Sequence, residues 1–376
     1  MNKICYFINS DWYFDLHWLE RALSAKGAGY DVCVITRFHG DEFLKKFTEL
    51  GLQCFPLPLQ ERSYNLFGFI SSALKTFKIL SKINPSIVHC VTIKPIIIGG
   101  VYSRFRKTPM VANIVGLGRV FEPRRWYENI LRKLVCLLYS TIFSNPRSHI
   151  VFEHQDDLAV FSRYVKFNHH YASVIDGCGV DTRLYGYSEE AESGVPVVFF
   201  ASRMLHNKGL TTLINIRKKL AAEGIPFRLW VAGILVADDP DAIRENEIER
   251  WHSEGDIEWL GTRKDIDSLI SQANVVALPT MYPEGVPRIL LEAASKGRAC
   301  IAYDSGGCKS IIVDSITGYL VHKGDEERFG AQLKKLLTSP ELRQRMGRNG
   351  RNLVIEKFSS SGVIDKTMDV YKNILR

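Results

Sequence analysis

The sequence predicts an α/β protein with two Rossmann-like domains, each a parallel sheet covered by helices. Short apolar segments of strand length alternate with segments of helical periodicity, and this alternation starts twice along the chain. Alternation of this kind is typical of parallel sheets. A chain of 376 residues is also too long for one ordinary core and fits two domains of about 150–200 residues each.

The first half begins with a predicted strand over 3–9, a helix over 14–26 and a second strand over 31–36. Further short apolar runs at 86–91 and 110–115 end at polar or glycine positions, so they are also interpreted as strands. The second half restarts with helices over 210–223 and 266–272, and with strands over 195–200, 227–232, 257–260, 275–278 and 299–303.

These elements divide the chain into an N-terminal domain of residues 1–185, a C-terminal domain of residues 186–358 and a final segment, 359–376. The most linker-like stretch is 186–194, which is rich in Gly, Ser and Glu.

Composition indicates a cytoplasmic protein. The eight cysteines occur singly, without a C-x-x-C pair, which favours reduced thiols over disulfides or a zinc site. The first residues are interpreted as a strand and not as an export signal. The longest apolar candidate, 134–143, has about half the length that a membrane-spanning helix needs.

Two carboxylates eight positions apart flank a helix start signal. Pro287 suits the first helical position and Gly297 suits the stop, so Glu284 is expected on a loop and Glu292 inside an apolar helix. A carboxylate in that setting is expected where a packed helix meets a cleft. The alternative for Glu292 is an i,i+4 salt bridge to a basic neighbour four positions away.

Two cations stand five residues apart at the end of the 195–200 strand. Arg203 and Lys208 can converge on one diphosphate, because a guanidinium group donates two parallel hydrogen bonds. Two solvated cations on a surface turn are the alternative.

Together these motifs resemble the retaining glycosyltransferases of sequence family 4. The resemblance rests on the Glu-x7-Glu run with Gly285 after the first Glu, and on the strand followed by Arg203 and Lys208-Gly209. It extends over nearly the whole chain through similar segments at 174–181, 304–307 and 317–321. Segments 92–95 and 115–121 are similar to a branch that builds bacterial surface polysaccharides on a lipid diphosphate carrier.

The resemblance implies the GT-B architecture, two Rossmann-like domains facing a cleft, with donor binding in the second and acceptor binding in the first. It also implies that 359–376 form a C-terminal helix that crosses back to the N-terminal domain. It implies glycosyl transfer from a nucleotide diphosphate with retention of configuration. Glu284 would hold hydroxyls of the transferred sugar, and Glu292 would accept hydrogen bonds from the ribose. Arg203 and Lys208 would stabilise the leaving group in place of a metal. Further substrate-binding positions are expected at Gly285, Val286, Arg263, Gly306, Gly307, Lys94 and Gly116.

The chain departs from the family at two places. The usual glycine pair after the first strand is here Asn9-Ser10-Asp11, and a His expected later has no counterpart at Val115-Gly116. His89 is the best substitute as a catalytic group, with a structural role as the alternative.

Two Asp-x-Asp pairs invite a search for a metal site. The pair at 239–241 lies in an acidic turn, and the pair at 265–267 opens a helix, where Asp265 suits a cap. Both are interpreted as structural, so no metal is expected.

The net charge of +8 lies in the first half. Residues 1–186 hold 23 Lys and Arg against 15 Asp and Glu, and residues 187–376 hold 26 of each. Helices expected at 65–84 and 119–133 combine basic with bulky apolar residues, which favours an anionic membrane surface; a core-facing helix with a solvated basic side is the alternative. The membrane residues expected are Arg124, Arg125, Trp126, Arg132 and Lys133. Nucleic acid is not expected, because no binding motif is present.

The sequence therefore predicts a retaining, UDP-sugar-dependent glycosyltransferase at the inner face of the bacterial plasma membrane. It would move a hexose or N-acetylhexosamine, with N-acetylgalactosamine as the first choice, onto a lipid-diphosphate-linked saccharide in surface polysaccharide synthesis, for example of O-antigen. The alternatives are a nucleotide-sugar epimerase on the same architecture and a catalytically silent membrane-associated binding protein. Donor base, linkage and oligomeric state stay open.

Overall fold

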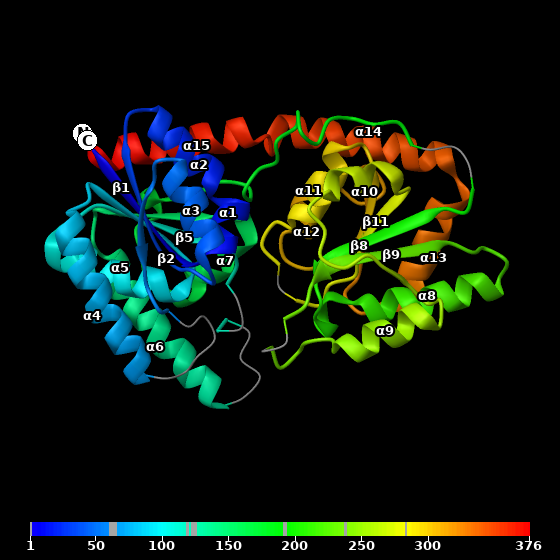
Figure 1. The fold of residues 1–376 in the computed structure, drawn as a ribbon, viewed down its shortest axis with the longest axis horizontal. Coiled ribbons are helices and arrows are strands. Elements are labelled where there is room, and N and C mark those ends of the chain that lie inside the picture. The colour runs from blue at the N-terminus through cyan, green and yellow to red at the C-terminus, as the bar shows by residue number, and fades with distance from the viewer. Residues whose placement is uncertain are drawn as a thin grey trace. The chain divides into compact units, whose positions relative to one another are not determined.

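The computed structural model describes residues 2–59, 66–117, 120–121, 126–190, 194–236, 239–282 and 284–376. The chain forms two compact units (Figure 1). Unit 1 comprises Met1–Cys178 with Val363–Arg376, and unit 2 comprises Gly179–Gly362. Each unit contains one sheet flanked by helices, and the strand pairs are parallel. The predicted fold class is confirmed.

Unit 1 has a seven-stranded sheet in the order β3-β2-β1-β4-β5-β6-β7. Its central strands are buried along their whole length, as expected for a parallel sheet covered on both faces. The strands are β1 (Lys3–Ser10), β2 (Asp31–Arg37), β3 (Gln53–Pro56), β4 (Ile87–Val91), β5 (Met110–Ile114), β6 (Ser148–Phe152) and β7 (Ala172–Val174).

The helices of unit 1 differ from the predicted elements at two places. The helix expected over 119–133 corresponds to α6 (Trp126–Phe143), and residues 119 and 122–125 lie outside the described part of the chain. The helix expected over 14–26 is two helices, because buried Trp18 leaves helical geometry at φ −127°. The helices are α1 (Asp11–His17), α2 (Leu19–Gly27), α3 (Asp41–Glu49), α4 (Leu66–Ile83), α5 (Ile93–Arg106), α6 (Trp126–Phe143), α7 (Gln155–Tyr164), η1 (His169–Tyr171) and α15 (Ser360–Leu375), which belongs to unit 1 from Val363 onward.

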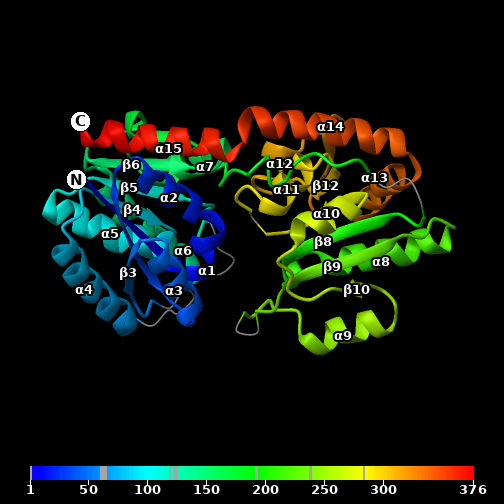
Figure 2. The same ribbon diagram turned by 45° about the horizontal axis from the view of Figure 1, so that its top comes forward.

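Unit 2 has a six-stranded sheet in the order β10-β9-β8-β11-β12-β13 (Figure 2). Its strands are β8 (Val197–Arg203), β9 (Arg228–Ile234), β10 (Glu258–Trp259), β11 (Val275–Leu278), β12 (Ala299–Tyr303) and β13 (Gly318–Val321). Its helices are η2 (His206–Lys208), α8 (Leu210–Ala222), α9 (Glu245–Ser253), α10 (Ile266–Gln272), α11 (Arg288–Ser295), α12 (Cys308–Ile311), α13 (Glu326–Thr338) and α14 (Pro340–Lys357).

The strand order places one switch point in each sheet. The direction of strand progression reverses between β1 and β4 in unit 1, and between β8 and β11 in unit 2. Ligands of open parallel sheets bind outside the carboxyl ends of the strands at such points. The ends of β8 and β11 lead directly into Arg203 and the loop that carries Glu284.

Candidate active site

A buried ion pair lies at the switch point of unit 2. The Lys208 ammonium group, at the end of η2, pairs with Oε1 of Glu284, and both side chains are mostly buried. The Thr280 hydroxyl, in the loop after β11, donates a hydrogen bond of 2.8 Å to the same oxygen. The Tyr282 ring also faces the ammonium group, with Nζ 5.4 Å from the ring centroid. One oxygen of Glu284 is therefore held by two donors.

Backbone contacts bring these two segments together. The Met281 N–H donates to the carbonyl oxygen of Asn207 at 2.7 Å, one residue before Lys208. Gly209 has φ +87°, and a Cβ there would lie 2.1 Å from the Pro279 carbonyl oxygen. Only glycine fits at this position, so the close approach of η2 to the loop after β11 fixes Lys208 beside Glu284.

The predicted substrate-binding glycines lie against Glu284. Gly306 has φ +52°, and its Cβ would lie 2.0 Å from the Glu284 carbonyl oxygen. The Gly307 N–H donates to that same carbonyl oxygen at 3.0 Å, and a Cβ there would lie 2.4 Å from the carbonyl oxygen of Gly285. The loop after β12 therefore supports the Glu284 backbone, and ligand contact by these glycines and by Val286 stays a prediction.

Arg203 ends β8 and is half-buried. Within the described ranges, its guanidinium group makes no hydrogen bond and no ion pair, unlike the ammonium group of Lys208. A half-buried cation without a protein partner at a switch point is suited to an anionic ligand.

Glu292 lies in α11 and is 5% exposed. Its Oε1 accepts a hydrogen bond of 2.6 Å from Nε of Arg288, so the i,i+4 salt bridge considered as the alternative does form. The Tyr185 side chain also lies beside this carboxylate. Burial raises the pKa of Glu292 above its ordinary value. Contact of Glu292 with a ribose stays a prediction.

The segment around Arg263 differs in one detail from its prediction. Asp265 precedes α10 but makes no capping hydrogen bond. It forms an exposed bidentate ion pair with Arg263, with hydrogen bonds of 2.6 and 2.8 Å. The Oδ1 of Asp239 accepts a hydrogen bond of 3.0 Å from the N–H of Asp241, so this pair lies in a turn. Among the described residues, no group of three or more His, Cys, Asp or Glu is arranged to hold a metal ion.

His89 requires a correction. It lies on β4 and is 0% exposed. Its Nδ1 forms a hydrogen bond of 2.5 Å with the Tyr371 hydroxyl. Burial lowers its pKa to about 3, with a smaller contribution from the Arg21 charge. An imidazole enclosed in the core in its neutral form has no access to a substrate, so His89 is structural.

The remaining predicted residues lie in unit 1. Lys94 is half-buried in the first turn of α5, and Gly116 follows β5 with φ +123°. Trp126 begins α6 and is 76% exposed, and Lys133 is also exposed. The Arg132 guanidinium lies 4.6 Å from the centroid of the Tyr164 ring. Arg124 and Arg125 lie outside the described residues.

Comparison with known families now decides the assignment. The model of glycosyl transferases group 1 matches residues 187–353, and the glycosyl transferase 4-like model matches residues 3–145. The chain is a glycosyltransferase with a glycosyl transferase 4-like domain followed by a group 1 domain. The two matches span both units and include the ion pair of Lys208 and Glu284.

Relatives and solved structures agree with this assignment. The glycosyltransferase is 21% identical, over 89% of its length and 90% of the other chain, to a Campylobacter jejuni N,N'-diacetylbacillosaminyl-diphospho-undecaprenol α-1,3-N-acetylgalactosaminyltransferase. It is 24% identical, over 91% of its length and 89% of the other chain, to an Escherichia coli UDP-Gal:α-D-GlcNAc-diphosphoundecaprenol α-1,3-galactosyltransferase.

Two structural likenesses show the same GT-B fold. A glycosyltransferase from Rickettsia africae superposes with a TM-score of 0.81 at 18% identity, over 100% of this chain and 99% of the other. Anabaena Alr3699/HepE, in complex with UDP and glucose, superposes with a TM-score of 0.79 at 16% identity, over 99% of this chain and 100% of the other.

Thr280 and Tyr185 are site residues that the sequence did not reveal. Each touches a carboxylate of the Glu-x7-Glu run, yet neither belongs to a recognisable pattern. Thr280 is two positions after β11, so the rule that ligands lie at strand ends is the one signal that could have found it.

Proposed function

We propose that this glycosyltransferase moves a hexose or N-acetylhexosamine, with retention, from a UDP-sugar onto a lipid-diphosphate-linked saccharide in bacterial surface polysaccharide synthesis. The observation that carries the proposal is the pairing of Lys208 with Glu284, together with Arg203 at the end of β8, which has no partner among the described residues. The first choice of donor is UDP-N-acetylgalactosamine, because the name of the Campylobacter relative gives N-acetylgalactosamine as the transferred sugar.

The donor site supplies its own positive charge. When the sugar leaves, negative charge develops on the diphosphate, and preorganised cations stabilise that charge most effectively in a partly buried site. Arg203 and Lys208 would bind the diphosphate, while Glu284 would accept hydrogen bonds from sugar hydroxyls through its second carboxylate oxygen. With two cations assigned to the leaving group, the proposal includes no metal. The UDP bound to Alr3699/HepE supports uracil as the base.

In the proposed reaction, the bond between the anomeric carbon and the UDP oxygen breaks as an acceptor hydroxyl attacks the same face. The acceptor proton passes to the departing diphosphate oxygen, so no enzyme base is required. This route is consistent with His89 being closed off in the core.

The acceptor proposal rests on the relatives and on the surface of unit 1. Both named relatives act on sugars linked to diphospho-undecaprenol. In the part of the chain that the structure describes, no helix combines the length and apolar character needed to cross a bilayer. We therefore place the enzyme on the cytosolic membrane surface.

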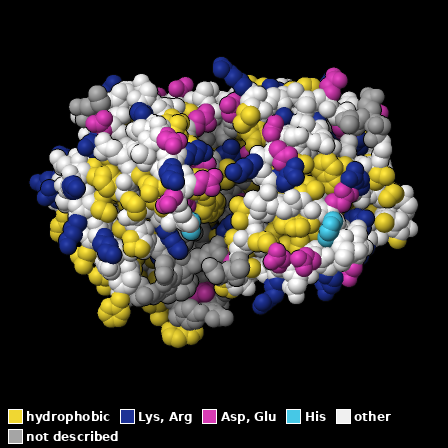
Figure 3. Space-filling model, viewed as in Figure 1, with side chains coloured by type: hydrophobic (Ala, Val, Ile, Leu, Met, Phe, Trp, Pro, Cys, Tyr) yellow, Lys and Arg dark blue, Asp and Glu magenta, His cyan; other side chains and the backbone are white. Residues whose placement is uncertain are grey.

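Two helices of unit 1 offer the apolar faces for this contact. Along α6, residues spaced at i, i+4, i+8 and i+11 are more than half exposed: Trp126, Ile130, Leu134 and Leu137. Along α4, Phe67, Ile70 and Leu74 lie at i, i+3 and i+7 and are 86%, 47% and 61% exposed, and Lys75, Lys78 and Lys82 are exposed beside them. Figure 3 shows hydrophobic side chains next to basic ones along the edge of unit 1 where these helices lie. Such a face suits an anionic bilayer surface.

The decisive experiment combines purified enzyme with UDP-N-acetylgalactosamine, UDP-N-acetylglucosamine, UDP-galactose and UDP-glucose, each with a prenyl-diphosphate-linked N-acetylglucosamine. We expect one donor to give a disaccharide whose new bond has the α configuration of the donor, read from the anomeric proton coupling. A β-linked product would reject retention. Hydrolysis or epimerisation of the nucleotide sugar without transfer would reject the transferase itself.

A further inference from the structure

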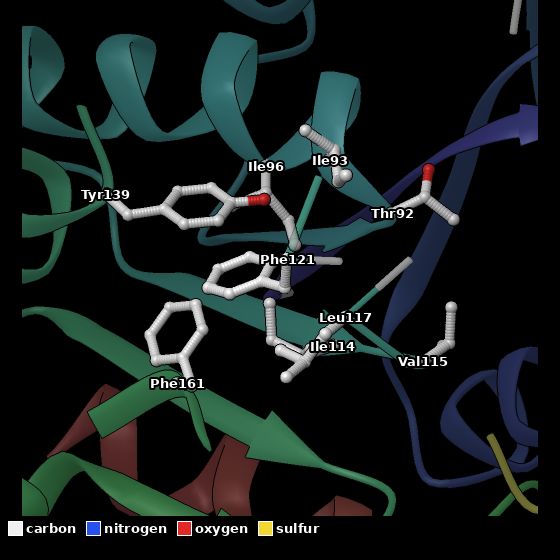
Figure 4. Close-up of a pocket in the computed structure, with 10 residues that line it drawn as sticks. Thr92, Ile93, Ile96, Ile114, Val115, Leu117, Phe121, Tyr139 and Phe161 are labelled. Carbon is white, nitrogen blue, oxygen red and sulfur yellow. The ribbon is translucent and has the colours of Figure 1, made fainter. Parts of the chain in front are cut away.

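A small apolar cavity opens at the carboxyl edge of the unit 1 sheet (Figure 4). Its inner wall is formed by buried Ile96, Tyr139 and Phe161, and its mouth by half-buried Ile93 and Val115. The volume free to a water-sized sphere is about 10 Å³. This is enough for one group of the size of a water molecule.

The cavity holds an unsatisfied donor. The Tyr139 side chain is 1% exposed, and its hydroxyl has no hydrogen-bond partner within the described part of the chain. In Figure 4 this hydroxyl points inward, toward Ile96. Burial raises the pKa of Tyr139, so the hydroxyl keeps its proton. Buried hydroxyl groups without a partner are rare in native proteins.

The backbone at the mouth is also unusual. Thr92, which follows β4, has φ +75° and ψ 166°, a conformation that residues with a Cβ rarely adopt. Such strain gathers at functional sites. Thr92 and Gly116 follow neighbouring strands beside the switch point of this sheet, where a ligand of unit 1 is expected.

We propose that this cavity binds the acetamido group of the acceptor sugar. The carbonyl oxygen would occupy the water-sized space and accept a hydrogen bond from the Tyr139 hydroxyl. The methyl group would pack against Ile93 and Val115 at the mouth. This inference rests on the proposed function, since it assigns part of the acceptor to unit 1.

The chemistry of the cavity selects this group over others. A prenyl chain would fit the apolar wall but would leave the Tyr139 hydroxyl unpaired, and it is larger than the space available. A sugar hydroxyl would offer an acceptor but no methyl group for the apolar mouth. The acceptor sugars named for both relatives carry acetyl groups on nitrogen, as this cavity requires.

The test compares two acceptors that differ only at this group: short-chain prenyl-diphosphate-linked N-acetylglucosamine and its glucose counterpart. The parent enzyme should prefer the acetylated acceptor by roughly tenfold in kcat/KM, from one hydrogen bond and one buried methyl group. Tyr139→Phe should raise KM for that acceptor by roughly fivefold, leave kcat unchanged and leave the glucose acceptor unaffected. Ile93→Trp, which fills the mouth, should abolish the preference.

Tyr102→Phe is the matched control. Tyr102 is a buried tyrosine of the neighbouring helix α5, and its hydroxyl donates to the Leu80 carbonyl oxygen at 3.1 Å. This variant should lower Tm and keep the acceptor preference, whereas Tyr139→Phe should keep Tm and reduce the preference to roughly twofold.

The outcomes separate the subsite from the proposed function. Two outcomes would show that the cavity holds only water: equal use of both acceptors by the parent, or an unchanged preference in Tyr139→Phe. Either would overturn the subsite and leave the proposed transferase function intact. Transfer to neither acceptor, with no Tm shift of the parent by either one, would overturn both.

Discussion

Lys208 and Glu284 are 76 positions apart in the sequence, yet their side chains form a buried ion pair. The pair joins η2, which follows β8, to the loop after β11, across the switch point of unit 2. A cation and a carboxylate are thereby fixed next to each other before any donor arrives. Arg203 makes no such pair, which separates the two basic residues in their expected response to mutation.

Arg203→Ala and Lys208→Ala should each reduce kcat by roughly 10²-fold, because each removes a charge that stabilises the leaving diphosphate. Only Lys208→Ala should also lower the free energy of unfolding, since it leaves the mostly buried Glu284 carboxylate without its cation. Steady-state kinetics and urea denaturation measure the two effects. The control is Lys219→Ala, which changes an exposed lysine of α8. Near-parent turnover of Arg203→Ala at saturating donor would contradict the assignment.

Thr280→Val should reduce kcat/KM by roughly tenfold. The substitution keeps the side-chain volume but removes the hydrogen bond to Glu284 and the acceptor for the Tyr282 N–H at 3.2 Å, so the carboxylate loses part of its orientation. Thr338→Val, whose hydroxyl bonds only within the exposed face of α13, should act like the parent. If both variants were equally active, Thr280 would have no role in the site.

Chelation should leave the reaction intact. The leaving group is assigned to Arg203 and Lys208, so activity should survive exhaustive EDTA treatment. Asp239→Ala and Asp265→Ala should retain most of it. The measurement is the initial rate before and after dialysis, and recovery by Mg²⁺ or Mn²⁺ after a loss would reject the charge assignment.

His89 should make the fold sensitive to acid. Its folded pKa of about 3 lies below the ordinary value of 6.5, so the unfolded chain binds the proton more tightly. Stability from this group is complete above about pH 6.5 and is lost as pH falls toward 3. Between pH 6.5 and 4 the loss should be on the order of 3 kcal/mol. Urea denaturation of His89→Gln should show a shallower pH dependence than the parent, and His170→Gln, an exposed control, should not.

Leu134→Glu/Leu137→Glu should release the enzyme from phosphatidylglycerol vesicles, because two charges replace side chains that are 54% and 65% exposed on α6. Transfer to a long-chain acceptor should slow, while a short soluble acceptor should be used as before. Leu184→Glu, at a leucine of unit 2 with 59% exposure, is the matched control in vesicle flotation.

Arg132→Glu/Lys133→Glu tests the electrostatic part of vesicle binding, which should weaken with salt. Equal flotation of all variants would mean that α6 is only a solvated face.

The strands predicted from the sequence are nine of the thirteen that the structure describes; β3, β6, β7 and β13 were not predicted. The edge strand β3 is only partly buried, so its alternation is weak, and β7 has just three residues. Helix α11 begins one residue later than predicted, with Pro287 as its cap, but Gly297 follows its end with φ +76°, as expected for a C-terminal stop.

The structural role of His89 was hard to predict for a physical reason. Every residue of β4 is buried, because parallel strands are covered on both faces, so no alternation shows which side chains face a ligand. Its partner Tyr371 is 282 positions away. The pairing depends on tertiary packing that no local pattern encodes. Arg203 and Glu284, by contrast, follow strands whose ends the sequence does mark.

The same contact gives the chain an order of assembly. Tyr371 of α15 is fully buried and donates to the hydroxyl of Tyr6 on β1 at 2.9 Å, so the first strand and the last helix share one core. During synthesis, the earliest residues leave the ribosome hundreds of positions before α15 does. The core of unit 1 therefore cannot close until α15 has been translated, whereas unit 2 is encoded as one uninterrupted stretch.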